Sequence, residues 1–501
     1  MMFYDKFLDR TPKIEYVKVK FPTFAGGIDA ETDENLVANN KACLSYNFHY
    51  ENGALTTGYG VEGILLPITE SDKEFTMTLE YEGSTVKYKG AWLYNYYSEE
   101  YSKYQRIVVL YGDDNKIYWF KLFSFDPYIY PVGKVMQSMP NGLHYTLNGK
   151  DMIILTSKED GMLVWRCNSN PVFVEDAPKI KSMCLHDGRL FAIVDNDRTR
   201  VWYSSNLDPT SWNVDTDENA GRIELPVGRG NLNKIVSFND YIYVIRDFSI
   251  LRINYYAATD TYQVSQLCEL GGRIHSGTIA VCGEKIFMLT DDGFYSFDGD
   301  ELEKIRVPIS PLLTNHNDAA VGAFFKEKYF VACRLNYSDG EVVGEEVNPG
   351  YVNNTLVAID VNTGKFTLTR GVDICWMLPV NEMSFSKLLL CVNGEKGSKI
   401  CELSNTGKYF SEVLPKVWNS PMTDLGRPEK KKLIKELYIK SQQFCRVCVK
   451  TESEKKVFEI QGGNKIRKIV LKMKAQKLAL SFESMNEENF ISTPEILVGL
   501  V

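Results

Sequence analysis

The chain repeats one pattern of apolar and polar positions: a run of β-branched and aromatic residues, a short polar turn, and a second run rich in aromatic residues. Asp, Asn and Gly stand in the turns, where the backbone needs positive φ. Five stretches carry the pattern, and each predicts a β-hairpin: Arg106–Leu122, Asp151–Arg166, Arg189–Ser204, Tyr241–Tyr255 and Lys285–Asp298. Looser copies at Lys328–Arg334 and Lys387–Ser404 raise the number of units to about seven.

The spacing of these units predicts a β-propeller. Successive units begin roughly 38 to 59 residues apart, which brackets the about 40 to 50 residues of a four-stranded propeller blade. A single blade cannot bury both faces of its sheet, so blades pack radially into a ring. We therefore expect an all-β protein with a propeller of about seven blades over residues 101–415.

Two further segments are expected to flank the ring. Near Lys416–Lys430, Pro421, Gly426 and Pro428 interrupt any regular element. Beyond them, residues 420–501 alternate apolar with polar positions in short runs, which predicts a small antiparallel β-sandwich. Residues 1–100 are interpreted as an N-terminal extended arm with a hairpin at Glu51-Asn52-Gly53. The sequence leaves open whether its strands complete the ring.

Charge divides the chain in the same place. The 501 residues carry a net charge of −8, yet residues 420–501 hold 16 Lys or Arg against 10 Asp or Glu. This asymmetry indicates a separate basic domain. Its candidate interface residues are Lys430, Lys431, Lys432, Arg467 and Lys468. The alternative is an ordinary solvated face.

One aromatic residue of the repeats is a further interface candidate. Trp212 follows the Asp208-Pro209 turn after an extended aromatic strand. The alternative is that Trp212 only packs beneath its own loop.

No pattern typical of catalysis or metal binding occurs. The five histidines are isolated, and HExxH, Walker and GxSxG motifs are absent from the sequence. Cys445 and Cys448 form a CxxC, but on a strand residues three apart point to opposite faces. Aspartate-rich stretches such as Asp291-Asp292-Gly293 are interpreted as turns. We therefore expect no enzyme, no catalytic residue, no metal and no cofactor.

Several stretches resemble the structural proteins of tailed-bacteriophage virions. The similarity is carried by Gly26-Gly27, Gly58-Tyr59-Gly60, Val201–Asn213, Ile242–Ile253, Ile286–Gly299 and Thr423–Ile439. The most similar kind is the propeller that acts as tail hub or packaged-DNA stabilisation protein of short-tailed phages.

The resemblance implies a structural role in a phage tail or neck. The protein would be made in the host bacterial cytoplasm and would form a ring, with six copies expected, that extends or seals the DNA conduit. Its partners would be portal, adaptor, tail tube, nozzle or fibre proteins, and DNA would pass without sequence-specific binding. No apolar run reaches the about 20 residues needed to cross a bilayer.

Two other classes of function are also compatible with the sequence. One is a receptor- or carbohydrate-binding tail propeller, with a glycan-cleaving enzyme as its variant. The other is an adaptor propeller of a cell that binds peptides on its face.

Overall fold

A computed structural model describes residues 14–66, 75–77, 86–98, 102–122, 128–149, 151–167, 169–217, 219–256, 261–314, 316–337, 350–381, 386–394 and 397–500. In this part of the chain the only helices are four short 3-10 turns: η1 (Phe24–Gly26), η2 (Leu147–Gly149), η3 (Ser276–Thr278) and η4 (Ser310–Leu312). None of them is long and apolar enough to cross a membrane. The chain forms two compact units: one is Gly60–Ser404, and the other joins Met1–Tyr59 to Asn405–Val501.

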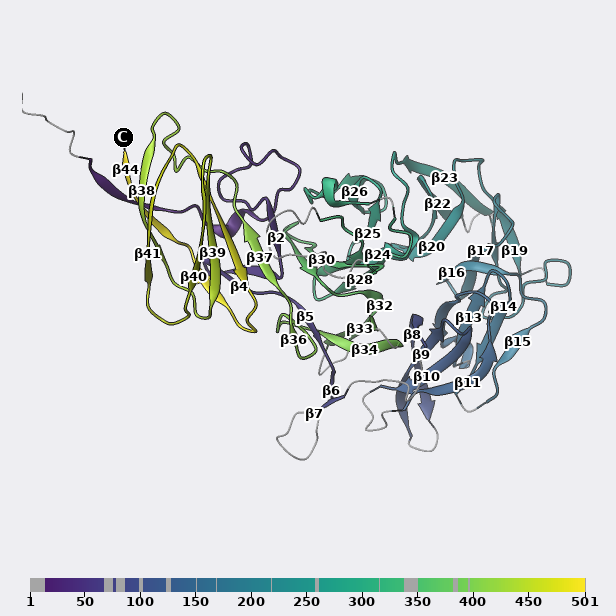
Figure 1. The fold of residues 1–501 in the computed structure, drawn as a ribbon. Coiled ribbons are helices and arrows are strands. Elements are labelled where there is room, and N and C mark those ends of the chain that lie inside the picture. The colour runs from purple at the N-terminus through teal and green to yellow at the C-terminus, as the bar shows by residue number, and fades with distance from the viewer. Residues whose placement is uncertain are drawn as a thin grey trace, which may run out of the picture. The chain divides into compact units, whose positions relative to one another are not determined.

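The unit Gly60–Ser404 is the propeller, and its four-stranded antiparallel blades follow one another along the chain (Figure 1). Blades 1 to 3 contain β8 (Tyr88–Ser98), β9 (Lys103–Gly112), β10 (Lys116–Lys121), β11 (Tyr130–Val135); β12 (Asn141–Tyr145), β13 (Met152–Ser157), β14 (Gly161–Trp165), β15 (Val172–Val174); and β16 (Ile180–His186), β17 (Arg189–Val194), β18 (Arg200–Tyr203), β19 (Gly221–Glu224). Blades 4 to 6 contain β20 (Leu232–Phe238), β21 (Tyr241–Arg246), β22 (Ser249–Tyr256), β23 (Thr261–Glu269); β24 (Ala280–Cys282), β25 (Lys285–Thr290), β26 (Gly293–Phe297), β27 (Leu302–Lys304); and β28 (Val321–Phe325), β29 (Lys328–Cys333), β30 (Thr355–Asp360), β31 (Phe366–Arg370).

The seventh blade joins both ends of this unit. It consists of β32 (Ile374–Asn381), β33 (Ser386–Gly394), β34 (Gly397–Ser404) and the N-terminal strand β5 (Gly60–Glu62), which pairs antiparallel with β34. A separate short pair, β6 (Ile64–Leu66) with β7 (Phe75–Met77), follows β5. The all-β propeller with about seven blades is thus confirmed. The N-terminal segment does complete the ring, a point that the sequence left open.

Apolar residues from neighbouring sheets fill the spaces between blades. Between blades 7 and 1, Trp376 and Leu389 pack with Val108 and Leu110 in one buried cluster. Similar clusters lie between blades 1 and 2, 2 and 3, 3 and 4, and 4 and 5. The first strands of neighbouring blades contact each other, as β8 does with β12 and β32, so these strands are the innermost of the ring.

The second unit is a β-sandwich. One sheet has the order β1-β44-β38-β41, another β2-β37-β42-β39-β40, and a third β3-β4-β43. Their bounds are β1 (Tyr16–Lys20), β2 (Leu44–Tyr46), β3 (Phe48–Glu51), β4 (Ala54–Thr57), β37 (Lys416–Asn419), β38 (Lys432–Ile439), β39 (Cys445–Thr451), β40 (Lys455–Ile460), β41 (Arg467–Ala475), β42 (Leu478–Ser484), β43 (Phe490–Ser492) and β44 (Glu495–Leu500), with a small pair β35 (Lys408–Tyr409) and β36 (Glu412–Val413). Ile434, Met473 and Ile496 of the first sheet share a core with Val447 and Phe482 of the second.

The expected hairpin at residues 51–53 is confirmed. β3 and β4 pair with Glu51 opposite Ala54. Asn52 and Gly53 have φ values of 48° and 83°, the combination that a tight two-residue hairpin turn requires.

The expected domain bounds differ from the observed ones. The expected propeller, 101–415, omits β8 and β5, which belong to the ring. The expected arm, 1–100, is divided, because β1 to β4 complete the sandwich and β5 closes the propeller. The sandwich predicted for 420–501 therefore takes strands from both ends of the chain. Strand partners so far apart in sequence leave no local signal, which explains the difference.

Candidate functional site

One face of the ring presents an acidic residue on successive inner turns. Because the strands of a blade alternate in direction, its first and third turns lie at the same end. In blades 3 to 6 the first turn, which joins the two innermost strands, exposes a carboxylate: Asp187, Asp240, Glu284 and Glu327. We call this end of the propeller the acidic face.

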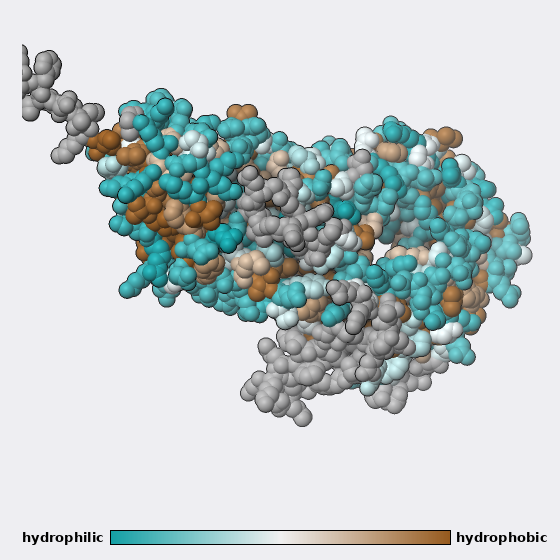
Figure 2. Space-filling view, in the orientation of Figure 1, coloured by the Kyte–Doolittle hydropathy of each residue, from teal (hydrophilic) through white to brown (hydrophobic). Residues whose placement is uncertain are grey.

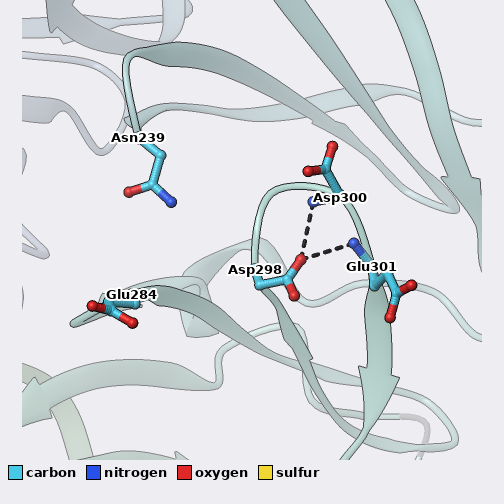
Figure 3. A pocket seen from close by; sticks show the side chains of 5 residues that line it. All are labelled: Asn239, Glu284, Asp298, Asp300 and Glu301. Carbon is cyan, nitrogen blue, oxygen red and sulfur yellow. Dashed lines mark hydrogen bonds between the residues drawn. The ribbon is translucent and has the colours of Figure 1, made fainter.

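The acidic face contains an open pocket of about 550 Å³ where blades 4 and 5 meet. Asn239 and Glu284 come from the first turns of the two blades, and Asp298, Asp300 and Glu301 come from the third turn of blade 5. Figure 3 shows Asn239 and Glu284 on one side of the pocket and the third turn of blade 5, with Asp298, Asp300 and Glu301, on the other. Four of the five lining residues are acidic, so the pocket favours a cationic guest.

Two of these carboxylates already have partners. Asp298 accepts the backbone N–H groups of Glu301 (2.8 Å) and Asp300 (3.0 Å), and these bonds hold the pKa of Asp298 below its usual value. The Asp300 carboxylate accepts a hydrogen bond of 2.7 Å from Arg252 of blade 4. In contrast, the exposed side chains of Glu284 and Glu301 make no ion pair or hydrogen bond within the described part of the chain. They are the carboxylates free to bind a ligand.

Aromatic side chains lie on the same face between blades 3 and 4. Tyr203 and Tyr255 each stand 5.2 Å from Tyr262, measured between ring centroids, and Phe191 lies 5.8 Å from Tyr262. Tyr255 and Tyr256 are 46% and 42% exposed at the end of β22. Exposed tyrosines and carboxylates on one face of the ring suit lysine or arginine side chains, which bind both carboxylates and aromatic faces.

Aspartates at the opposite end of the blades have structural partners. In blades 1, 2, 4 and 5 an aspartate of the second turn accepts the backbone N–H of a residue that precedes the first strand of the same blade. The pairs are Asp113 with Lys87 (3.0 Å), Asp160 with Gln137 (2.8 Å), Asp247 with Asn231 (2.8 Å) and Asp291 with Arg273 (3.0 Å). Throughout the described residues, no three His, Cys, Asp or Glu side chains converge as metal ligands.

The interface residues expected in the C-terminal domain do not form one cluster. Lys430 and Lys431 lie exposed in the turn before β38, whereas Arg467 and Lys468 are exposed beside the far end of that strand, where Ile439 pairs with Arg467.

Lys432 is not a surface residue, which corrects its expected role. It is 1% exposed, and its Nζ donates to the carbonyl oxygens of Arg427 (2.7 Å), Lys430 (3.0 Å) and Gln476 (2.8 Å). Burial lowers the pKa of this ammonium. The side chain therefore holds the 427–431 turn against β41 instead of meeting a partner.

Trp212 is also buried. It is 2% exposed, packs in the cluster between blades 2 and 3, and donates from Nε1 to the Pro209 carbonyl at 2.8 Å. Its candidacy as an interface residue is wrong, and the alternative, packing beneath its own loop, is the observed arrangement.

Replacing Lys432 by methionine should destabilise the sandwich unit by about 2 kcal/mol, because three inward carbonyl oxygens lose their donor. Lys431→Met removes the same charge from the exposed neighbour and should change stability by less than about 0.5 kcal/mol. Urea unfolding of both variants measures the difference. Equal stabilities would show that the Lys432 hydrogen bonds contribute nothing.

The pocket residues were not predicted from the sequence. Asp298, Asp300 and Glu301 lie at and just beyond the end of a predicted hairpin, and turn geometry explained their composition. The available signal was the recurrence of an acid at the first turn of consecutive repeats.

No family model and no curated protein matches the chain. Similar solved structures include two crystal structures of BBS1N in complex with ARL6DN, one soaked with mercury and one with lead. Their TM-scores are 0.41 and 0.42; each is 10% identical to this chain and covers 68% of it and 97% of its own length. A likeness this distant assigns neither partner nor function to this chain.

The resemblance to tailed-phage virion proteins was wrong. The two similar structures named above are complexes of BBS1N with ARL6DN and not virion proteins. The tail or neck role, the portal and tail partners, the six-copy ring, the passage of DNA and the virion location are therefore withdrawn. The physical reason lies in the motifs themselves. Ile242–Ile253 and Ile286–Gly299 are blade hairpins, and any propeller needs such strands and turns.

Proposed function

We propose that the protein is a non-enzymatic interaction scaffold whose acidic face binds a lysine- or arginine-containing segment of a partner protein. The observation that carries this proposal is the pocket between blades 4 and 5, where Glu284 and Glu301 are exposed without a cationic partner within the described residues. The carboxylates do not converge as metal ligands do, which favours an organic cation. The tyrosines at the end of β22 would extend the contact beyond the pocket.

A fluorescein-labelled peptide of alternating glycine and arginine tests the proposal by fluorescence anisotropy on the full chain. Glu284→Gln with Glu301→Gln should weaken binding about tenfold, because two charges at an exposed site contribute about 0.5 to 1 kcal/mol each. Raising the salt concentration should reduce the difference.

The matched control is Glu175→Gln with Asp176→Asn. These residues are exposed after β15 at the opposite end of blade 2, and they remove the same charge. Control binding within twofold of the unaltered protein is expected. If both double variants weakened binding equally, the peptide would respond to net charge alone and the pocket would be rejected as its site.

A further inference from the structure

The sheet β1-β44-β38-β41 has one face toward the core and one toward solvent. Ile434, Leu437, Leu471 and Ile496 point into the core of the sandwich. Strand register then gives the residues of the outward face. The three rows across the strands are Tyr16, Gly499, Leu433 and Lys474; Lys18, Leu497, Glu436 and Val470; and Lys20, Glu495, Tyr438 and Lys468.

The outward face carries six lysines and two glutamates. An irregularity in the pairing between Ile434 and Glu436 adds Lys435 and Lys472, both exposed, between the first two rows. The lysines are Lys18, Lys20, Lys435, Lys468, Lys472 and Lys474, and the glutamates are Glu436 and Glu495. We call this set the basic face. It draws on both ends of the chain, so a count of charge along the C-terminal segment alone does not define it.

Four of the six lysines have no ion pair with a described residue. Lys18 lies 3.9 Å from Glu495, and Lys468 lies 3.6 Å from Glu436. The four are Lys20, Lys435, Lys472 and Lys474. Adjacent strands are about 4.8 Å apart and alternate residues about 7 Å apart along a strand, so the basic face presents a lattice of point charges rather than one binding point.

Apolar groups lie among these charges. Val470 is 49% exposed on the face, and Ile466, which precedes β41 in the same alternation, is 67% exposed. Tyr16 is 38% exposed beside Gly499. Figure 2 shows hydrophobic residues among hydrophilic ones over the region where Figure 1 shows β41, and also over β40, which belongs to the other sheet and not to the basic face.

We propose that the basic face docks on a membrane surface that contains anionic phospholipid. Lipid phosphates and carboxylates form a negatively charged layer, which is complementary to a sheet face with six ammonium groups. Val470 and Ile466 would enter the interfacial region below the headgroups, where apolar side chains gain by leaving water. Lysine serves as a point charge for such a layer, without the fixed geometry of paired arginine contacts.

Single-stranded nucleic acid suits this face less well. Such ligands bind by stacking bases on aromatic rings along a charged groove. Here, the Lys18 ammonium lies 4.1 Å from the ring centroid of Tyr438, and the Lys435 ammonium 4.6 Å from that of Tyr16. The protein's own lysines thus occupy the ring faces that bases would need.

Sedimentation of the full chain with vesicles tests the proposal. Vesicles of phosphatidylcholine with about 30% phosphatidylserine should bind it at low salt, and pure phosphatidylcholine vesicles should not. Substituting glutamine for Lys468, Lys472 and Lys474 together should weaken binding about a hundredfold, at about fivefold per lysine. Val470→Ser keeps the charge and should weaken binding two- to fivefold.

The control variant changes Lys89, Lys158 and Lys179 to glutamine. These lysines are exposed on the propeller, and their loss alters the net charge equally. Its binding should stay within twofold of the unaltered protein. Equal losses in both triple variants, or no binding to phosphatidylserine vesicles, would overturn the proposal. Tighter binding of a single-stranded oligothymidine, with the same dependence on the lysines, would also overturn it. Circular dichroism checks that every variant is folded.

Discussion

Replacing Val61 by aspartate should open the propeller and destabilise it by at least about 4 kcal/mol. Val61 is the central residue of β5, is 1% exposed and lies opposite Leu403 of β34. A carboxylate at this position would be buried without a partner, which costs several kcal/mol. The strand would then leave the seventh blade, and β34 would become an unpaired edge.

Two substitutions on the same strand separate the buried charge from a loss of volume. Val61→Ala should cost about 2 kcal/mol through the cavity that it leaves. Glu62→Gln, on the more exposed side of β5, should stay within about 0.5 kcal/mol. Urea unfolding followed by tryptophan fluorescence reports the loss, because Trp376 packs in the cluster between blades 7 and 1. Equal stability of the aspartate and alanine variants would contradict the burial of residue 61 in the strand that closes the ring.

The blades could be predicted because each is a local structure. β25 and β26 are joined by a short turn at Asp291-Asp292, so their pairing is visible in one stretch of sequence. The closing strand β5 has three residues, and its partner β34 lies more than 300 residues away. Such a pairing depends on the completed ring. The contribution of β1 to β4 to the sandwich could not be predicted for the same reason, because their partner strands are also distant in the sequence.

The binding residues were harder to predict than the fold. Lys430 and Lys432 are alike as charges in a sequence, yet one is exposed and the other satisfies three carbonyl oxygens. The pocket depends on two blades meeting, which brings Asn239 of blade 4 close to Glu284 and Glu301 of blade 5. Sequence patterns indicate that a turn is acidic. They do not indicate which carboxylates accept hydrogen bonds from the backbone of the turn itself, as Asp298 does.

A second buried lysine makes the stability of the sandwich unit depend on pH. Lys416, the first residue of β37, is fully buried, and its Nζ donates to the Asn486 carbonyl at 2.6 Å. Burial lowers its pKa from 10.5 to about 8, against the opposing attraction of Glu487. The folded unit therefore holds the neutral amine at a pH where the unfolded chain holds the ammonium.

The sign of the effect follows from proton uptake. Between pH 8 and pH 10.5, unfolding takes up a proton at Lys416, so the free energy of unfolding rises with pH in this window. Below pH 8 both states are protonated, and the full cost of the buried ammonium, about 3 kcal/mol, is present. Above pH 10.5 that cost disappears.

Lys416→Met should remove this dependence. The free energy of unfolding of the variant, minus that of the unaltered protein, should fall by about 2 to 3 kcal/mol as the pH rises from 7 to 10.5. Loss of the hydrogen bond to Asn486 adds a cost that does not change with pH. Urea unfolding at a series of pH values measures the difference, in which the titrations of other groups cancel. Lys430→Met removes one lysine from an exposed turn and controls for net charge. If the difference between the Lys416 variant and the unaltered protein were constant across the window, Lys416 would not be the group that titrates.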